Sequence, residues 1–337
     1  MTPGFTLVFS PPTNPMSTST VIAKRDRILG GLWGALVGDA LGVPVEFRDR
    51  ATVQLDPVRG MRAFGTHRQP RGTWSDDSSM LLCTVESLAH HEFSLADLAE
   101  RFIRWMSDGL WTAHGDVFDM GGTTRTALLR IAQGISPERS GGVHKDSNGN
   151  GSLMRILPAV LRFADEPLDS FSGRLEKVSA ITHAHARSRM ACAFYGLMVR
   201  QLLLGSPPST ALHSARAEFA AWYDESAELS HFRQILQGDL ATLSESEVLS
   251  GGYVLHTLHA SLWCLLTTQN FHDCVLKAVN LGGDTDTTGC VAGGLAGVAY
   301  GIKSIPANWV HDLARRNDVD CLFVEFANLC NNKGVQK

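Results

Sequence analysis

The sequence predicts an all-α protein built as one large domain. Apolar residues recur at the spacing of helix faces in segments of about 10–20 residues, and short loops rich in Gly, Ser and Asp separate these segments. Sustained period-two alternation, which is typical of strands, does not occur. No Pro-rich linker or shift in composition divides residues 24–337, so we expect a single helical domain there.

Composition narrows the class of protein. The chain of 337 residues is 44% hydrophobic and has a mean hydropathy of −0.02, as expected of a soluble globular protein with a sizeable core. Its formal charge of −4 and isoelectric point of about 6.3 argue against binding to nucleic acid, which requires a basic surface. The seven cysteines include no CxxC pair, so we expect reduced thiols in a cytoplasmic protein rather than disulfides or a zinc site.

Two apolar stretches, residues 28–47 and 287–302, are not predicted to span a membrane. Asp39 interrupts the first, and the second is shorter than the roughly 20 residues that a bilayer requires.

Residues 1–23 are predicted to form a flexible arm. They contain four prolines and no charged side chain, and no basic region precedes their short apolar run, unlike in a signal peptide. Two alternatives remain open for this segment: translation could start at Met16, or the arm could bind a partner.

Within the domain, helices and loops alternate from end to end. Residues 51–71, 108–124 and 141–151 are expected to be loops, and the last of these is expected to lead directly into a helix at Leu153. The other expected helices are 24–41, a helix opening at the motif 72–79 and running to 88, 94–106, 125–132, 171–182, 184–204, 210–223, 230–240, 253–266, 271–279, 287–300, 308–315 and 319–330.

Two of these helices carry glycine every fourth residue. One ridge is Gly30, Gly34 and Gly38, and the other is Gly289, Gly293 and Gly297. Glycine is costly inside a helix, so its repetition on one face indicates close approach by another backbone. We expect both ridges at crowded helix crossings near the centre of the protein; separate packing against bulky neighbours is the alternative.

The segment 282–289 carries the strongest chemical signal. Asp284 and Asp286 alternate with Thr285 and Thr287, and glycines flank the group. Carboxylates two residues apart in an irregular turn can face one centre, and hard divalent cations prefer such oxygen ligands. A simple helix N-cap is the alternative interpretation.

A second hydroxyl-acid cluster, Ser75, Asp76 and Asp77, stands at the start of another helix. If the two clusters meet, four carboxylates share one site, and they would repel one another or become protonated without cations. Two Mg²⁺ or Mn²⁺ ions fit such a site better than zinc, because no His or Cys set accompanies the acids.

Two glycine-rich segments are candidates for binding an anion. The segment 148–152 contains Asn150, Gly151 and Ser152 before the expected helix at Leu153, where free N–H groups and the helix dipole would attract phosphate. The segment 121–124 contains Gly122. Arg155 and His183 could add polar contacts, although His183 could equally be a helix cap.

These motifs together resemble the ADP-ribosylglycohydrolase family, dinuclear-metal enzymes that remove ADP-ribose from proteins. The matching segments occur in the family's order and span roughly residues 24–302. They are residues 34–42 with Glu46, 73–78, 149–155, 182–183 and 282–289.

The resemblance implies a compact, orthogonal multi-helix fold with two Mg²⁺ or Mn²⁺ ions in a central cleft. It places the segment 149–152 at the diphosphate or distal ribose. With Gly122 from the second glycine-rich segment, the candidate substrate-binding residues are Gly122, Asn150, Gly151, Ser152 and His183. The family usually has Thr at the position of Ser75, and serine keeps the ligand oxygen. The implied metal ligands are Ser75, Asp76, Asp77, Asp284, Asp286 and Thr287.

The implied chemistry is coherent. Hydrolysis of an N-glycosidic bond to a guanidinium needs a polarised ribose, an activated water and a protonated leaving group, and a carboxylate can serve as general base. Asp76, Asp77 or Asp286 is the expected base, and Glu46 is expected to position the substrate near the scissile ribose.

The linkage that is cleaved stays open at this stage. ADP-ribosylated arginine in a protein is the first expectation, and serine-linked, O-acetyl-linked or polymeric ADP-ribose are alternatives. Such an enzyme could counteract an ADP-ribosyltransferase, which the N-terminal arm could contact.

Two other functions are kept as alternatives. The chain could bind ADP-ribose or block a toxin without turnover, as an immunity protein would. The string Asp284-Thr285-Asp286-Thr287-Thr288 also matches the DxDxT motif of haloacid-dehalogenase-type phosphatases, but those require a parallel sheet that the pattern here does not predict.

Overall fold

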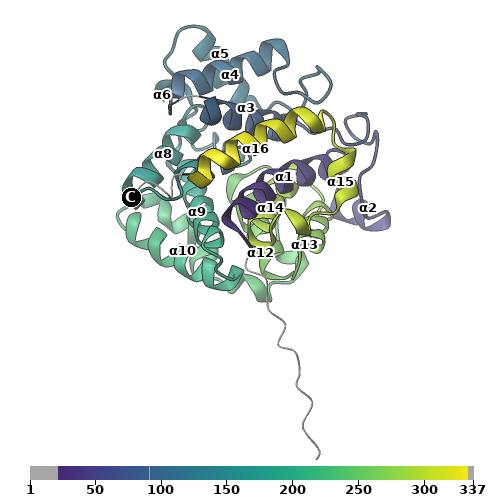
Figure 1. The fold of residues 1–337 in the computed structure, drawn as a ribbon. Coiled ribbons are helices and arrows are strands. Elements are labelled where there is room, and N and C mark those ends of the chain that lie inside the picture. The colour runs from purple at the N-terminus through teal and green to yellow at the C-terminus, as the bar shows by residue number, and fades with distance from the viewer. Residues whose placement is uncertain (1–21, 91, 333–337) are drawn as a thin grey trace, which may run out of the picture.

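A computed structural model describes residues 22–90 and 92–332, and this part of the chain is helical without any strand (Figure 1). Only three isolated β-bridges occur in it. The α-helices are α1 (Lys24–Gly42), α2 (Arg50–Leu55), α3 (Asp76–His90), α4 (Leu95–Asp108), α5 (Gly122–Ala132), α6 (Pro137–Ser140), α7 (Leu157–Phe163), α8 (Leu168–Ala180), α9 (Ala186–Leu203), α10 (Pro208–Trp222), α11 (Arg233–Gln237), α12 (Val254–Leu266), α13 (Phe271–Val279), α14 (Thr285–Tyr300), α15 (Ala307–Asp312) and α16 (Arg316–Asn332). The 3₁₀ helices are η1 (Val43–Val45), η2 (Ala227–Phe232), η3 (Leu240–Thr242), η4 (Glu245–Glu247) and η5 (Ile302–Ser304).

Helices α1 and α14 form the centre of the fold, and their two glycine ridges pack directly on each other. A Cβ atom placed on Gly38 would lie 1.9 Å from the carbonyl oxygen of Gly289, and one on Gly34 would lie 2.3 Å from that of Gly293. The order of these contacts makes the two helices antiparallel. The expectation of a crowded crossing at the centre is confirmed; we call this contact the glycine seam.

The other helices surround the seam (Figure 1). Helices α12 and α13 pack on α14, while α16 and α3 pack on α1 and on each other. Helix α9 lies between α8 and α10 and reaches α14. The segment 24–45 is the one described helix long and apolar enough to cross a membrane, but its whole apolar window is buried inside the fold.

Local sequence signals explain where several helices begin. Ser94 accepts a hydrogen bond from the backbone N–H of Asp97 at the start of α4, and Asn270 does the same for Asp273 at the start of α13. Gly109, at a φ of 70°, ends α4 in the left-handed conformation that glycine adopts easily.

Three expectations about secondary structure are wrong. The loop expected over 51–71 contains α2, which Asp49 caps through the N–H of Thr52. The helix expected over 230–240 is wrong in its end: η2 continues directly into α11, which stops at Gln237 because the chain is extended at Gly238, and η3 follows separately. The helix expected from Leu153 begins only at Leu157, and a turn fills the gap.

The structure has no parallel sheet within its described residues, and the segment before α14 is the helix α13. The phosphatase alternative for the DxDxT string is therefore excluded. The predicted arm lies almost wholly outside the described part of the chain.

Candidate active site

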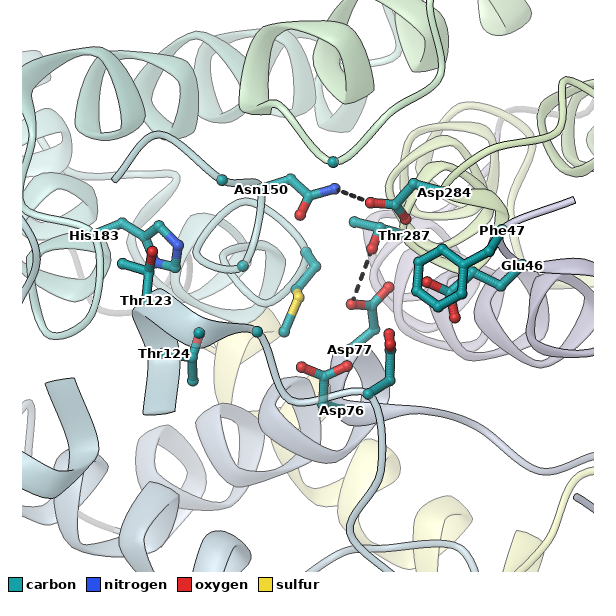
Figure 2. A pocket seen from close by; sticks show the side chains of 17 residues that line it. Glu46, Phe47, Asp76, Asp77, Thr123, Thr124, Asn150, His183, Asp284 and Thr287 are labelled. Carbon is teal, nitrogen blue, oxygen red and sulfur yellow. Dashed lines mark hydrogen bonds between the residues drawn. The ribbon is translucent and has the colours of Figure 1, made fainter. Parts of the chain in front are cut away.

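A cavity of about 250 Å³ opens where the N-terminal ends of α3 and α14 meet the loops after α1 and before α5 (Figure 2). Figure 2 shows carboxylates gathered on one side of it and His183 with Thr123 and Thr124 on the other. The lining residues are Glu46, Phe47, Asp76, Asp77, Asp119, Gly121, Gly122, Thr123, Thr124, Gly149, Asn150, Gly151, Met154, His183, Gly252, Asp284 and Thr287.

The start of α3 is held by a buried carboxylate from α1. The side chain of Asp39 accepts hydrogen bonds from the N–H groups of Ser75 and Ser78, both at 3.0 Å, and from the Ser78 hydroxyl at 2.5 Å. Burial raises the pKa of Asp39 to about 6, although these hydrogen bonds favour its charged form. Asp39 thus orients Asp76 and Asp77 toward the cavity, a role that sequence reasoning did not assign.

The two acidic clusters expected from the sequence lie together in space. The Thr287 hydroxyl donates to Oδ1 of Asp77 at 3.3 Å, linking α14 to α3. Carboxylate oxygens of Asp39, Asp77 and Asp286 lie within 4.8 Å of one another, and so do those of Glu46, Asp284 and Asp286.

The carboxylates are not balanced by protein cations. Among the described residues, no hydrogen bond reaches Oδ2 of Asp77, Oδ1 of Asp284 or Oδ2 of Asp286, although all three atoms are buried. Within the described part of the chain, no lysine or arginine lines the cavity. Burial and the neighbouring carboxylates raise the pKa values of Asp77 and Asp286 well above their ordinary range.

The pKa of Asp76 is also raised well above its ordinary range, first by burial and then by the charges of Asp119 and Asp39. Buried carboxylate oxygens without a partner, with hydroxyl oxygens beside them at two helix ends, are the donor set of hard divalent cations. The residues present therefore fit Mg²⁺ or Mn²⁺.

Ser75 and Asp286 contribute from behind the cavity surface rather than lining it. The Ser75 hydroxyl accepts from the N–H of Asp77 at 3.2 Å, and Asp286 accepts from the N–H of Thr287 at 2.9 Å. Both residues are buried.

Asn150 joins the glycine-rich loop to the acidic side of the cavity. Its amide donates to Oδ2 of Asp284 and to the hydroxyl of Thr257, both at 2.9 Å (Figure 2). Its backbone N–H donates to the carbonyl of Gly252 at 3.0 Å and is therefore not free for an anion. The N-terminus of α7 starts at Leu157, so the expected helix dipole does not begin at this loop.

The remaining predicted binding residues divide into two groups. Gly122, Gly151 and His183 line the cavity with Asn150. Ser152 does not line it, since its hydroxyl accepts from Ser179 at 2.8 Å inside the fold. Arg155 is also buried and turned into the core.

Sequence reasoning missed Asp119, which lies in the loop before α5 at a φ of 61°. Burial and the charge of Glu46 raise its pKa to about 8. Burial and the charge of Asp284 raise the pKa of Glu46 to about 8 as well. A single carboxylate in a long polar loop forms no pattern that could have revealed it.

His67 was missed for the same reason. The Phe64–Gln69 bridge closes a small turn, and His67 Nε2 lies 2.5 Å from Oε2 of Glu46. Phe47, which is 66% exposed, stands beside the His67 ring at the mouth of the cavity. His67 thus holds the side chain of Glu46 in place, although His67 lies outside the sequence motif that contains Glu46.

Comparison with known proteins gives concordant results. The ADP-ribosylglycohydrolase family model matches residues 20–335. The ADP-ribosylarginine hydrolase Tri1 of Serratia proteamaculans is 30% identical over 299 residues, which cover 88% of this chain and 78% of that protein. The ADP-ribosyl-[dinitrogen reductase] glycohydrolase of Rhodospirillum rubrum is 32% identical over 293 residues, which cover 86% of this chain and 90% of that protein.

Similarity extends to more distant relatives and to a solved structure. The ADP-ribosylhydrolase ARH3 of Danio rerio is 27% identical over 351 residues, covering 89% of this chain and 92% of that protein. A solved structure described as an ADP-ribosylglycohydrolase-related protein complex superposes with a TM-score of 0.78 at 32% identity, covering 91% of this chain and 99% of that one.

Proposed function

The chain belongs to the ADP-ribosylglycohydrolase family and is an ADP-ribosyl hydrolase, and from that premise we propose that it releases ADP-ribose from arginine side chains of proteins with two Mg²⁺ or Mn²⁺ ions. One observation is the basis of the proposal. Carboxylates from the starts of α3 and α14 meet at one cavity, where described residues provide no partner for several buried oxygens and no lining lysine or arginine.

The charge of the cavity supports arginine as the linkage. An ADP-ribosylated guanidinium is a cation, whereas serine-linked and O-acetyl-linked ADP-ribose carry no positive charge at the scissile bond. Glu46 and Asp119 line the cavity, and a guanidinium bound beside them would be attracted to whichever of the two is ionised and would favour its charged form. The name of the Serratia relative, an ADP-ribosylarginine hydrolase, agrees with this choice.

The cations would be held by Asp76, Asp77, Asp284, Asp286 and Thr287, with Ser75 supporting them from behind. Such ions orient ribose hydroxyls and lower the pKa of water. Asn150 keeps Asp284 in place through its amide hydrogen bond.

The reaction also needs two proton transfers. The water oxygen forms a bond to the anomeric carbon and loses a proton, while the carbon–nitrogen bond breaks and the guanidine nitrogen gains one. Of the three expected bases, Asp76 and Asp77 line the cavity and Asp286 does not, which favours the first two as acceptors. Glu46 and Asp119, with pKa values raised to about 8, can hold the proton that the leaving nitrogen takes.

The neutral side of the cavity is the proposed seat of the diphosphate and distal ribose. Gly122, Asn150, Gly151 and His183 line it, and Ser152 supports the loop from inside. A Cβ atom on Gly151 would lie 2.9 Å from Cε1 of His183, so this position has no room for a side chain. The loop and the imidazole therefore form one continuous surface.

A cellular role follows from the chemistry. Removing ADP-ribose restores the unmodified arginine, so the enzyme would reverse an ADP-ribosyltransferase, whether a toxin or a regulator. Free cysteines, all buried except Cys321, support a cytoplasmic location as part of this proposal. A contact between the N-terminal arm and the transferase stays a prediction.

The test uses the full chain with peptides ADP-ribosylated on arginine or on serine, and with O-acetyl-ADP-ribose. We expect release of free ADP-ribose from the arginine peptide with Mg²⁺ or Mn²⁺, and little release with chelator. Faster cleavage of the serine peptide would contradict the proposed linkage, and unchanged rates in chelator would contradict the role of the cations.

A further inference from the structure

Arg155 is a buried cation that the reaction does not use. Its side chain is fully buried, with the guanidinium over the ring of Phe102 at 4.5 Å from the centroid. Nη1 and Nη2 each donate to the carbonyl of Val178 at 3.3 Å, and Nη2 also donates to the Thr182 hydroxyl at 2.8 Å. No carboxylate pairs with it among the described residues, and burial lowers its pKa to about 10. Burying an unpaired charge is costly, so its position calls for an explanation.

The Thr182 hydroxyl connects Arg155 to His183. Its oxygen lies 2.9 Å from Nδ1 of His183. Arginine has no acceptor, so Arg155 must donate to the hydroxyl oxygen. The only remaining neighbour for the hydroxyl hydrogen among the described residues is Nδ1 of His183. If that nitrogen accepts, the hydrogen of the neutral ring is on Nε2.

The opposite assignment leaves a group unpaired. If His183 carried its hydrogen on Nδ1, the ring and Arg155 would both donate to the Thr182 oxygen. The buried hydroxyl hydrogen would then have no acceptor in the described structure, which is unfavourable.

The ring of His183 is neutral and lines the cavity. Burial, and then the charge of Arg155, lowers its pKa to about 3. Its Cε1–Nε2 edge faces the glycine-rich loop: Cβ atoms placed on Gly149 and Gly151 would each lie 3.5 Å from Nε2. Nε2 has no hydrogen-bond partner within the described residues, so a hydrogen there is available to a ligand.

We propose that Arg155 and Thr182 are positioning residues that fix His183 as the Nε2–H tautomer, which gives the neutral side of the cavity a hydrogen-bond donor for an oxygen of ADP-ribose. A neutral donor suits this site, because a cationic one would be drawn to the carboxylates across the same cavity. The choice of ligand rests on the proposed function, whereas the tautomer does not.

The tautomer is measured by long-range ¹H–¹⁵N correlation on the full chain labelled in histidine, with the His183 signals identified from a His183→Gln variant. We expect the Nε2–H pattern in the wild type and in Thr182→Ser, and a mixture of tautomers in Thr182→Val, which lacks the hydroxyl. An Nδ1–H pattern in the wild type, or an unchanged pattern in Thr182→Val, would overturn the proposal.

Arg155→Met should also show a mixture of His183 tautomers. If His183 stays in the Nε2–H form in this variant, Arg155 does not help to fix the tautomer. If that variant does not fold, the two Thr182 variants still decide the question, since they keep the arginine.

Kinetics on ADP-ribosylarginine peptide give the second readout. Thr182→Val should raise KM about tenfold with kcat nearly unchanged, because one well-oriented hydrogen bond is lost. Thr182→Ser keeps the hydroxyl and should have the KM of the wild type.

Thr84→Val is the matched control, because the Thr84 hydroxyl is equally buried but bonds, among the described residues, only to the Met80 carbonyl of its own helix. Equal KM in wild type and Thr182→Val would refute the role in binding. If no variant turns over this peptide, the proposed linkage fails while the NMR pattern still tests the tautomer.

Discussion

The glycine seam and the acidic cluster occupy the same two helices and are opposite in character. Along the seam, α1 and α14 approach so closely that backbone contacts backbone, as at Gly34 and Gly293. About one turn before Gly289, at the N-terminal end of α14, the side chains of Asp284 and Asp286 leave buried oxygens unpaired. The seam is closely packed, whereas the acidic cluster lies beside a cavity and its carboxylates repel one another.

The two regions meet at Gly42. A Cβ atom there would lie 2.4 Å from the Cα of Asp286, and the Thr285 hydroxyl donates to the Gly42 carbonyl at 2.8 Å. The last contact of the seam therefore fixes the backbone of an acidic residue. Because α1 and α14 are packed rigidly along the seam, they cannot separate to relieve the repulsion in the acidic cluster. The seam therefore allows these carboxylates to be held close together.

The largest expected effect comes from breaking the seam. Gly38→Ala places a methyl group 1.9 Å from the Gly289 carbonyl oxygen, and backbone on both sides cannot yield. We expect a loss of at least about 3 kcal/mol in the free energy of unfolding, measured by urea denaturation.

Gly173→Ala in α8 is the matched control. No described atom lies within 4 Å of its added Cβ, so the substitution should stabilise the protein by roughly 0.5–1 kcal/mol through helix propensity. A Gly38→Ala protein as stable as this control would show that the seam does not constrain the fold.

The next effect separates activity from stability. Asp286→Ala removes a carboxylate from the cluster and should lower ADP-ribose release by at least about a hundredfold. The helical fold should persist, because the side chain lies at a helix end rather than along the seam. Circular dichroism and single-turnover kinetics test both parts, with Asp320→Ala on the exposed face of α16 as control. Full activity of Asp286→Ala would mean that the cluster is structural.

The repulsion in the cluster predicts how the chelated protein responds to pH. Folded-state pKa values of about 8 for Glu46 and Asp119 lie above the value of about 4 in an unfolded chain. A group of this kind stabilises the fold fully below its unfolded pKa, and that contribution is lost as pH rises through the folded pKa. Between about pH 6 and about pH 8.5, the chelated protein should therefore lose at least about 2 kcal/mol of stability, because each group of this kind contributes about 1.4 kcal/mol per pH unit below its folded pKa.

Urea denaturation at the two pH values, with chelator and then with excess Mn²⁺, measures this loss. Added cation should restore stability at the higher pH by cancelling the charge. A chelated protein that is equally stable at both values would argue against repulsion among these carboxylates.

The seam was predictable because helical periodicity is a local property of the sequence. The glycine spacing indicated a crowded crossing, and the bounds of α1, α12 and α13 agree with the predicted ones to within about a residue. The short helix α2 was not predicted, because its six residues are too few for a clear periodic pattern.

The site was predictable only where it is built from helix ends with a repeated chemical pattern. Asp119 reaches the cavity from an irregular loop, and His67 contacts the cavity residue Glu46 from another. Their positions depend on tertiary contacts that no local pattern encodes. Ser152 was predicted to bind the substrate but does not line the cavity. A glycine-rich loop indicates that the backbone can approach a ligand, but its sequence does not show which of its side chains turn into the core.

The smallest expected effect lies where the acidic cluster meets the loop. Asn150 donates to Asp284 at 2.9 Å, so it restrains a carboxylate that no seam contact fixes. Asn150→Ala should weaken the affinity for Mn²⁺ about tenfold, the lower end of what loss of a hydrogen bond to a ligand side chain costs, and leave the unfolding midpoint of the chelated protein nearly unchanged. Titration calorimetry measures the first, and the matched control is Asn280→Ala, whose amide bonds, among the described residues, only to backbone groups outside the cavity. If Asn150→Ala bound Mn²⁺ as tightly as the wild type, the hydrogen bond from Asn150 would not be needed to position Asp284. The packing of α1 on α14 would then be enough to position every carboxylate of the cluster.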